Sequence, residues 1–334
     1  MNAFSSNKIF WHLDKLKAIK RNKPLYPVTF TIDPTNICNE DCDFCLNGMQ
    51  RKNTPTELSL KEIKDILDLS KEIGVKGIKI AGGGEPLKYS KIEELLDLLA
   101  LYDFDYGLNT NGSLMIPELY KKLSIFKYIN VSIESFDPRI YKEIRKVDKV
   151  EQVKDNISLF QKNNFKTKLN ISLLIHEKAY KDILKTVNIA KKLEVDSVNI
   201  KSLIFNQEYK NNYNSIDFKL LKKLINKAKK LETENFIINV KQKEIINYNK
   251  CEAIYLGGVW GADHKFHLCC DRRNSNIILF DFSNNVFDFK KHWASKEHML
   301  TVKKINPFKE CESCSYNSYN IILQNLDDMF EELI

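Results

Sequence analysis

From residue 28 onward, short apolar runs rich in β-branched residues alternate with longer segments in which apolar residues recur at helical spacing. The short runs predict strands and the longer segments predict amphipathic helices, an alternation typical of βα units in a mostly parallel sheet. We expect strands at residues 28–33, 77–81, 105–109, 128–133, 167–175 and 197–204. These are fewer than the eight strands that close a barrel. The pattern therefore predicts an α/β fold, a partial (βα)6 barrel of parallel strands.

Several residues between these runs are typical of helix ends. Ser59 and Ser90 each precede a glutamate by three residues, the spacing of a capping box, and Gly74 suits the end of the first helix. Pro117 and Pro138 suit the first turns of two later helices. These positions support the alternation of strands and helices.

The alternation stops near residue 205, which divides the chain into parts. We expect an amino-terminal helical extension over residues 1–24 and the partial barrel over residues 25–210. A bridging segment with a helix at residues 217–231 follows over residues 211–245. Residues 246–334 are short, irregular and rich in cysteine, and predict a small separate domain.

Composition narrows the class of protein. With 43% hydrophobic and 29% charged residues, the chain is a folded globular protein. No apolar run approaches the ~18 residues of a spanning helix, and the amino terminus has no signal-peptide core, so we expect a cytoplasmic protein with no membrane partner. The 52 Lys and Arg residues exceed the 44 Asp and Glu residues, but the lysines are spread over amphipathic helices. This distribution argues against a nucleic-acid partner.

The eight cysteines form two groups, three within residues 38–45 and five within residues 251–314. In a reducing cytoplasm such groups indicate metal before disulfide. Cys38, Cys42 and Cys45 follow the first strand, where a barrel places its chemistry. Three thiolates on a four-iron cluster would leave one iron open for a reactive cofactor. A zinc knuckle that borrows a fourth ligand from a distant cysteine is the alternative.

This loop, with Phe44 before its last cysteine, resembles the signature of the radical S-adenosylmethionine (SAM) enzymes, and the resemblance covers residues 28–205. In that family, strand two ends in a GGE(P) segment whose backbone holds the methionine amino group. Gly83, Gly84 and Glu85 stand at that place. The resemblance implies a 4Fe-4S cluster on the three cysteines and S-adenosyl-L-methionine as the second cofactor.

The same resemblance suggests further cofactor contacts. Asn109 and Asn111 lie in a segment similar to the TNG segment of the family. Ser132 and Glu134 look like the serine and acidic residue that approach the ribose, and Arg145 resembles a cation placed near the methionine carboxylate. A polar turn, an ordinary half-buried strand and a surface arginine are the respective alternatives.

In the carboxyl-terminal part, Cys251, Cys269, Cys311 and Cys314 are separated by 17, 41 and 2 residues. Four thiolates suit either a tetrahedral zinc ion or a fully ligated 4Fe-4S cluster, and spacing alone leaves both open. Beside a radical SAM core, the pattern is similar to the twitch domain, the shortened relative of the SPASM domain. That resemblance implies one auxiliary 4Fe-4S cluster and a hairpin formed by residues 265–269 and 276–280.

Cys270 is the spare cysteine of this group. Adjacent cysteines do not easily serve one tetrahedral ligand set, and the twitch spacing favours Cys269. An exchangeable ligand, a packing residue and a hydrogen-atom donor are the roles left open for Cys270.

The family resemblance implies reductive cleavage of SAM to methionine and a 5′-deoxyadenosyl radical, which removes a substrate hydrogen. The overall architecture is similar to the two-cluster radical dehydrogenases of the family. Our first hypothesis is therefore an oxidoreductase that oxidises a hydroxyl-bearing carbon of a cyclitol, amino sugar or sugar nucleotide, with the auxiliary cluster as electron acceptor. His176, Lys201 and Tyr209 are eligible as the catalytic base by position, although each also fits a structural role.

Two other functions stay open. The first is a SPASM-type maturase or epimerase of a ribosomal peptide, although the 37 residues before Cys38 are few for a leader-binding domain. The second is a zinc-binding protein that binds nucleic acid. For the radical SAM hypothesis, the resemblance implies flavodoxin or ferredoxin as the reductant.

Overall fold

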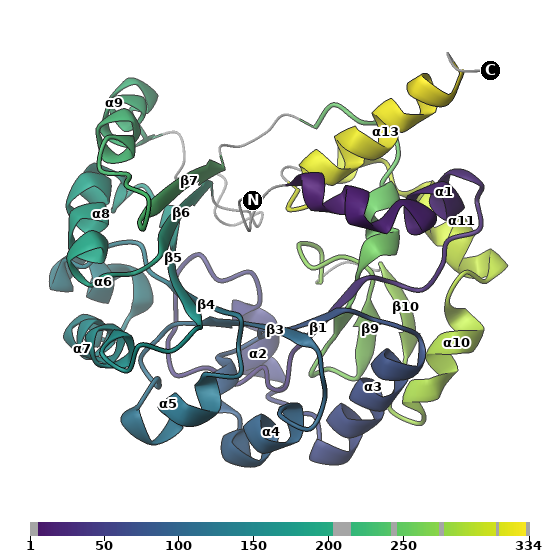
Figure 1. Cartoon of the computed structure of the whole chain (residues 1–334), viewed down its shortest axis with the longest axis horizontal. Coiled ribbons are helices and arrows are strands. Elements are labelled where there is room, and N and C mark those ends of the chain that lie inside the picture. The colour runs from purple at the N-terminus through teal and green to yellow at the C-terminus, as the bar shows by residue number, and fades with distance from the viewer. Residues whose placement is uncertain (1–5, 203–214, 242–245, 274–276, 312–313, 332–334) are drawn as a thin grey trace.

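The computed structural model describes residues 6–202, 215–241, 246–273, 277–311 and 314–331. Its main feature is a single sheet with the strand order β10-β9-β8-β1-β2-β3-β4-β5-β6-β7. The parallel strands of the barrel are β1 (Thr29–Ile32), β2 (Gly77–Ile80), β3 (Asp105–Thr110), β4 (Tyr128–Ser132), β5 (Lys168–Ile175), β6 (Ser197–Ser202) and β7 (Ile237–Lys241). They curve into an open barrel, which confirms the predicted fold class (Figure 1).

Helices cover the outer face of this barrel (Figure 1). They are α3 (Leu60–Glu72), α4 (Ile92–Leu99), α5 (Pro117–Leu123), α6 (Pro138–Arg145), α7 (Val150–Gln161), α8 (Ile183–Lys192) and α9 (Phe218–Lys229). Ser59 and Glu62 form the predicted capping box of α3, and Gly74 follows that helix with φ +77°. The second capping box was a wrong prediction, because Ser90 bonds Glu57 and α4 begins after Lys91.

The sequence-based prediction missed strand β7. This strand pairs in parallel with β6 and continues the barrel beyond the six strands that we expected. It is only five residues long and lies between charged residues, so its alternation of apolar and polar positions is short. The bridging segment therefore contains both the expected helix, now α9, and a seventh parallel strand.

The carboxyl-terminal part extends the same sheet. Strand β8 (Val259–Trp260) pairs in parallel with β1, and β9 (Lys265–His267) with β10 (Ile278–Asp281) forms the predicted antiparallel hairpin. Phe30, Trp260 and Phe266 pack edge to face at this junction, with ring centroids 4.8 to 5.7 Å apart. The cysteine-rich part is thus continuous with the barrel sheet, and the domain boundaries themselves remain predictions.

Shorter elements complete the described chain. Before β1 lie η1 (Ser6–His12) and α1 (Leu13–Lys20), which form the expected helical extension. The remaining elements are α2 (Gly48–Asn53), η2 (Pro86–Lys88), η3 (Tyr180–Asp182), η6 (Glu252–Leu256), η7 (Val286–Asp288), α10 (Phe289–His292), α11 (Lys296–Lys304), α12 (Pro307–Glu310) and α13 (Asn317–Glu331). Among the helices that the structure describes, none is long and apolar enough to cross a membrane.

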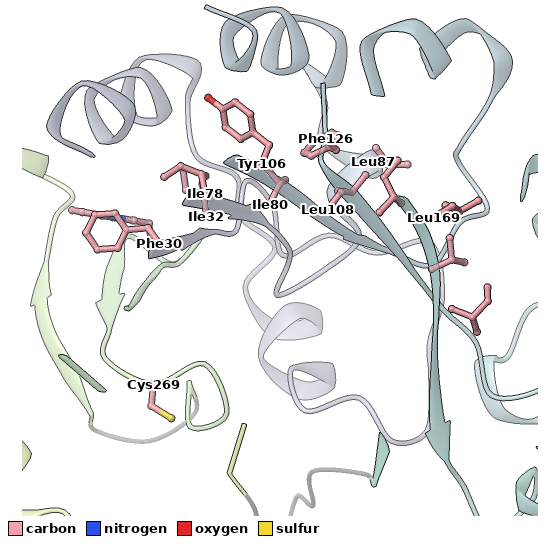
Figure 2. Close-up of a cluster of buried hydrophobic side chains, with 14 of the residues drawn as sticks. Phe30, Ile32, Ile78, Ile80, Leu87, Tyr106, Leu108, Phe126, Leu169 and Cys269 are labelled. Carbon is pink, nitrogen blue, oxygen red and sulfur yellow. The ribbon is translucent and has the colours of Figure 1, made fainter. Parts of the chain in front are cut away.

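The two faces of the barrel sheet differ in polarity. Ile78, Ile80 and Leu108 belong to the hydrophobic core between the strands and the outer helices (Figure 2). The alternate positions on β3 and β4 carry Asn109 and Asn130, which are in register, and the Asn130 amide donates to Asn109 at 3.0 Å. Side chains alternate between the faces of a strand, so the inside of the barrel is polar.

Candidate functional site

The amino-terminal cysteine loop leaves β1 and reaches α2 across the carboxyl ends of the strands. Cys38, Cys42 and Cys45 are all partly buried. A turn brings the last two together, because the Cys45 amide donates to the Cys42 carbonyl at 3.2 Å. Burial raises the pKa of the Cys42 thiol, and the nearby Arg145 only partly offsets this effect. The loop lies where the sequence predicted it.

The GGE segment fastens the loop to the end of β2. The Gly84 amide donates to Thr35, and the Glu85 amide donates to Ile37 at 2.9 Å. A Cβ on Gly84 would collide with the Ile37 carbonyl, so only glycine allows this approach. Gly83 also lies against the loop, since a Cβ there would meet Asn36 at 3.2 Å.

The Glu85 side chain connects this segment to the end of β3. Its carboxylate accepts from the Thr110 hydroxyl at 2.6 Å and from the backbone amide of Asn111 at 2.7 Å. Burial raises the pKa of Glu85 to about 7, despite these hydrogen bonds. The Glu85 carboxylate thus joins the GGE segment to the end of β3. The backbone of the GGE segment bonds the cysteine loop.

Asn111 connects β3 directly to the cysteine loop. Its side-chain amide donates at 2.8 Å to the side chain of Asn39, which lies between the first two cysteines. The side-chain amide of Asn39 in turn donates at 2.8 Å to the Ser113 hydroxyl. Asn109 instead pairs with Asn130 inside the barrel. The structure therefore separates the two predicted asparagines: one holds the loop and the other lines the barrel.

A buried ion cluster lies beneath the loop. The Arg145 guanidinium donates to Glu40 at 2.6 Å and to both carboxylate oxygens of Glu134 at 2.7 and 3.0 Å. It also donates to the Ser132 carbonyl at 2.8 Å. Burial by itself would lower the pKa of Arg145, but the two carboxylates hold that pKa above its ordinary value. The predicted contacts of Ser132, Glu134 and Arg145 with the cofactor stay predictions, and the structure adds their mutual pairing.

His176, one of the three candidate bases, contacts the cysteine loop. Its Nε2 lies 3.0 Å from Asp43 Oδ1, and its ring packs edge to face on Phe44 with centroids 5.8 Å apart. Lys178 also pairs with Asp43, at 3.3 Å. Burial would raise the pKa of Asp43, but His176 and Lys178 hold that pKa below its ordinary value. His176 thus contacts the cysteine loop directly, and its role as a base stays a prediction.

Of the other two candidate bases, the structure describes Lys201 alone. Lys201 lies on β6, beside Lys241 of β7. Tyr209 lies outside the described residues. Lys201 is also in register with Leu174 of β5, two residues before His176, and the assignment of a base stays a prediction.

The carboxyl-terminal cysteines come from four separate segments. Cys251 precedes η6, Cys269 follows β9, Cys311 follows α12 and Cys314 precedes α13. Cys251 lies close enough to the other three cysteines for their charges to affect one another. The same holds for Cys311 and Cys314. Burial raises the pKa of Cys251 to about 12 and that of Cys311 to about 11. Metal binding by these thiols must therefore displace protons.

Hydrogen-bond donors surround Cys314. The Tyr316 amide donates to its sulfur at 3.2 Å. The Asn320 amide and the Tyr248 hydroxyl face the same sulfur, and both donor atoms are buried without an oxygen or nitrogen partner in the described chain. Donors of this kind stabilise cluster thiolates, so these residues fit an iron–sulfur group.

Cys270 lies beside Cys269 and near the Tyr316 side chain. Its pKa is raised to about 12 by burial and by Asp271, and Lys79 of β2 is among the charges that face it. Its sulfur lies 3.4 Å from Asp271 Oδ1. Figure 2 shows Cys269 on the loop after β9, and this cysteine is buried as part of the hydrophobic core. The roles proposed for Cys270 remain predictions.

Within the described ranges, no three or more His, Cys, Asp or Glu side chains converge as ligands of one metal ion. The ligands of an iron–sulfur cluster each bind a different iron, so they surround the cluster and do not meet at one point. The assignment of the seven cysteines to two clusters therefore remains a proposal.

Sequence reasoning missed the residues that support the loop. Glu40 and Asp43 lie between the cysteines. Glu40 forms a long-range ion pair with Arg145, and Asp43 lies within hydrogen-bonding distance of His176. Asp33, just after β1, pairs with Arg273 of the carboxyl-terminal part. Acidic residues inside a cysteine loop were a visible signal for the first two. No local signal indicated the pair of Asp33 and Arg273.

Known proteins match the chain in sequence and in fold. The radical SAM superfamily model matches residues 32–190. The probable GTP 3',8-cyclase of Thermococcus kodakarensis is 34% identical over 151 residues, which cover 44% of this chain and 48% of that protein. The mycofactocin maturase MftC of Mycolicibacterium smegmatis is 35% identical over 107 residues, 32% of this chain and 27% of that protein. These matches thus span about half or less of either relative.

Among solved structures, Streptococcus suis SuiB bound to its precursor peptide SuiA has a TM-score of 0.69 and 18% identity. The match covers 90% of this chain and 71% of SuiB, and it shows a shared fold. The superfamily match confirms the two cofactors predicted for the amino-terminal loop, a 4Fe-4S cluster and SAM. Residues 32–190 of this chain therefore belong to the radical SAM superfamily.

Proposed function

We propose that this chain is a radical SAM enzyme that removes a hydrogen atom from a substrate held inside its open barrel. Cys38, Cys42 and Cys45 would hold the 4Fe-4S cluster, and the backbone of Gly83 and Gly84 would bind the methionine end of SAM. When bound, the cluster and SAM supply a 5′-deoxyadenosyl radical. The observation that carries this proposal is the attachment of the cysteine loop to the ends of β2, β3 and β5 and to α6.

The chain's own residues would orient the cofactor and keep the loop rigid. Phe44 packs on His176, and Asn111 bonds Asn39, so two strand ends position the loop from opposite sides. Asn109, Ser132, Glu134 and Arg145 stay our proposed contacts to SAM. A rigid, pre-organised site of this kind holds the reacting atoms in a productive arrangement.

We further propose that Cys251, Cys269, Cys311 and Cys314 hold one auxiliary 4Fe-4S cluster. The donors Asn320 and Tyr248 support this assignment, because they are buried beside the Cys314 sulfur. When bound, a fully ligated cluster of this kind can accept or donate single electrons. The oxidoreductase class rests on this second cluster and is part of the proposal.

For the substrate, we propose a small polar molecule. The polar inner face of the barrel supports this choice, and the Thermococcus relative is named for an activity on GTP, which is small and polar. Oxidation of a cyclitol, our first hypothesis from the sequence, has no support from the comparisons. The relatives favour a wider search that includes nucleotides and sugar phosphates.

A peptide substrate is the second candidate. The mycofactocin maturase relative favours it, and the SuiB structure contains a precursor peptide. The expected reductant is a flavodoxin or a ferredoxin in either case. A cytoplasmic location likewise stays part of the proposal.

The test is formation of 5′-deoxyadenosine by the anaerobically reconstituted enzyme under reductant. Nucleotides, sugar phosphates and short peptides would be added separately, and substrate-dependent stimulation would be measured for each. Stimulation by a small polar compound supports the first candidate, and stimulation by peptides alone would replace it with the second. Absence of any SAM cleavage from iron-loaded enzyme would contradict the proposal as a whole.

A further inference from the structure

Two lysines on the last strands of the barrel face each other. Lys201 of β6 and Lys241 of β7 are in register, so both side chains project from the same face. Val198 and Ile200, at the alternate positions of β6, are buried in the core beneath the helices. Both lysines therefore project into the barrel, near the carboxyl ends of their strands.

A third lysine approaches from the opposite wall. Lys79 is the third of the four residues of β2. Its neighbours Ile78 and Ile80 face the outer helices, so Lys79 faces the inside of the barrel. Burial, followed by the charges of Lys241 and Lys79, lowers the pKa of Lys201 to about 8. Residues from β2, β6 and β7 thus form one group of positive charges, which we call the lysine cluster: Lys79, Lys201 and Lys241.

Among the described residues, the lysine cluster has little compensating negative charge. Lysines on the outer helices form ion pairs, for example Lys61 with Asp65 at 2.7 Å. Within the described ranges, the side chain of none of the three cluster lysines forms an ion pair or hydrogen bond. Asp33 is the acidic group that faces Lys79, and it already pairs with Arg273.

Neutral amides complete this part of the wall. The Asn239 side-chain amide donates to Asn199 at 3.0 Å. These two asparagines lie two residues before the two lysines, on the same face of β6 and β7. Asn170 of β5 accepts from the Ser197 hydroxyl at 2.7 Å. The wall thus offers hydrogen bonds without adding charge.

Like charges placed directly opposite each other on neighbouring strands are unfavourable, and more so when they are partly buried. An anion placed among them removes this repulsion and gains charge-assisted hydrogen bonds. We propose that the lysine cluster binds an anionic group of the substrate, a phosphate or a carboxylate. This inference rests on the proposed function, because it assigns the substrate of that site to a chemical class.

The test is calorimetric titration of the anaerobic holoenzyme with two probes, inorganic pyrophosphate and citrate, at low ionic strength. The test variant is Lys201→Met with Lys241→Met. The control variant is Lys192→Met with Lys230→Met, which removes two exposed charges from the ends of α8 and α9. We expect binding to the unaltered enzyme, at least about tenfold weaker binding to the test variant and unchanged binding to the control.

The two probes distinguish the sources of the anion. Tighter binding of pyrophosphate assigns a phosphate, and tighter binding of citrate assigns a carboxylate. Failure of both probes to bind the unaltered enzyme, or equal weakening in test and control variants, would overturn the proposal. Thermal unfolding provides a second readout, because a bound anion raises the melting temperature of the unaltered enzyme and not that of the test variant.

SAM cleavage by the unaltered enzyme is measured in the same preparation. Loss of cleavage together with retained anion binding would contradict the proposed function and not the anion site. Normal cleavage together with absent anion binding would contradict the anion site and not the proposed function.

Discussion

The amino-terminal cysteines lie within eight consecutive residues, whereas the four carboxyl-terminal cysteines that we propose as ligands come from four segments spread over residues 251–314. In the first group the chain itself places the thiols, and the fold only has to hold one loop. In the second group β9, α12, α13 and the segment before η6 must all be in place before the thiols meet. The first site is therefore local in sequence and the second depends on long-range packing.

The surroundings of the two sites differ in charge as well. The loop rests on buried ion pairs, in which Arg145 contacts Glu40 and Glu134. At the carboxyl-terminal site, the neutral donors Asn320, Tyr248 and the Tyr316 amide face Cys314. Among the described residues, the charged groups nearby, Asp271, Arg272 and Glu310, act on the cysteines without a buried ion cluster of the kind beneath the loop. We expect substitutions of charged residues to harm the first site more, and losses of single hydrogen bonds to affect the second.

The largest expected effect separates the two cysteine groups by activity. A Cys38→Ala, Cys42→Ala, Cys45→Ala variant should lose SAM cleavage by about 10³-fold or more, because the cofactor supplies the difficult chemistry. A Cys311→Ala, Cys314→Ala variant should keep SAM cleavage and lose substrate turnover. Quantification of 5′-deoxyadenosine and of product measures both. Equal loss of cleavage in the two variants would remove the division of roles.

Arg145→Met should give the largest loss of stability. It leaves Glu40 and Glu134 buried without their cation, which should lower the free energy of unfolding by about 3–5 kcal/mol. The matched control is Arg139→Met in the same helix, because the Arg139 side chain is 95% exposed. Urea unfolding of the two variants measures the difference. Similar stability of both would show that the ion cluster does not hold the loop.

The pKa of Glu85 predicts a dependence of stability on pH. Its pKa is about 7 in the folded chain and about 4.5 when unfolded. The contribution of Glu85 to the free energy of unfolding is therefore full below pH 4.5, where the carboxyl is protonated in both states. This contribution is lost as the pH rises through about 7, because ionisation is less favourable in the folded chain. The decrease should be about 1–3 kcal/mol.

Glu85→Gln is the matched variant for this prediction, because it removes the titrating group and keeps one oxygen that can accept from one of the two donors, Thr110 or Asn111. Denaturant unfolding between pH 5 and pH 8 should show a flatter profile for this variant than for the unaltered chain. Identical profiles would mean that the Glu85 carboxyl does not titrate in this range.

The smallest expected effect concerns the carboxyl-terminal site. Asn320→Ala removes the acceptor of the Ala253 amide and a donor beside Cys314, and should lower the free energy of unfolding by about 1–2 kcal/mol. It should also shift the reduction potential of the auxiliary cluster. Asn325→Ala, on the exposed side of α13, is the control. Unchanged stability and potential in Asn320→Ala would argue against its role.

Local features of the chain were predictable from the sequence. Strands β1 to β6 and the Ser59 capping box follow from periodicity and short motifs, and the β9–β10 hairpin follows from the resemblance to the twitch domain. Strand β7 was missed because five residues carry too short a pattern. The pair of Asp33 and Arg273 joins residues 240 positions apart, and no local pattern encodes such a contact.

The candidate site divides in the same way. The cysteine spacing and the GGE segment identified the loop, and Gly84 proved necessary because of its approach to Ile37. The partners of Arg145 and His176 could not be predicted, since they depend on how α6 and β5 meet the loop in space. Motifs thus located the chemistry, and packing determined which residues support it.

The most direct test of two separate clusters is iron, sulfide and zinc analysis of the anaerobically reconstituted enzyme and of the two cysteine variants. We expect about eight irons in the unaltered enzyme and about four in each variant. Zinc in place of iron, or an iron content in the unaltered enzyme that only one cysteine group accounts for, would contradict the two-cluster account.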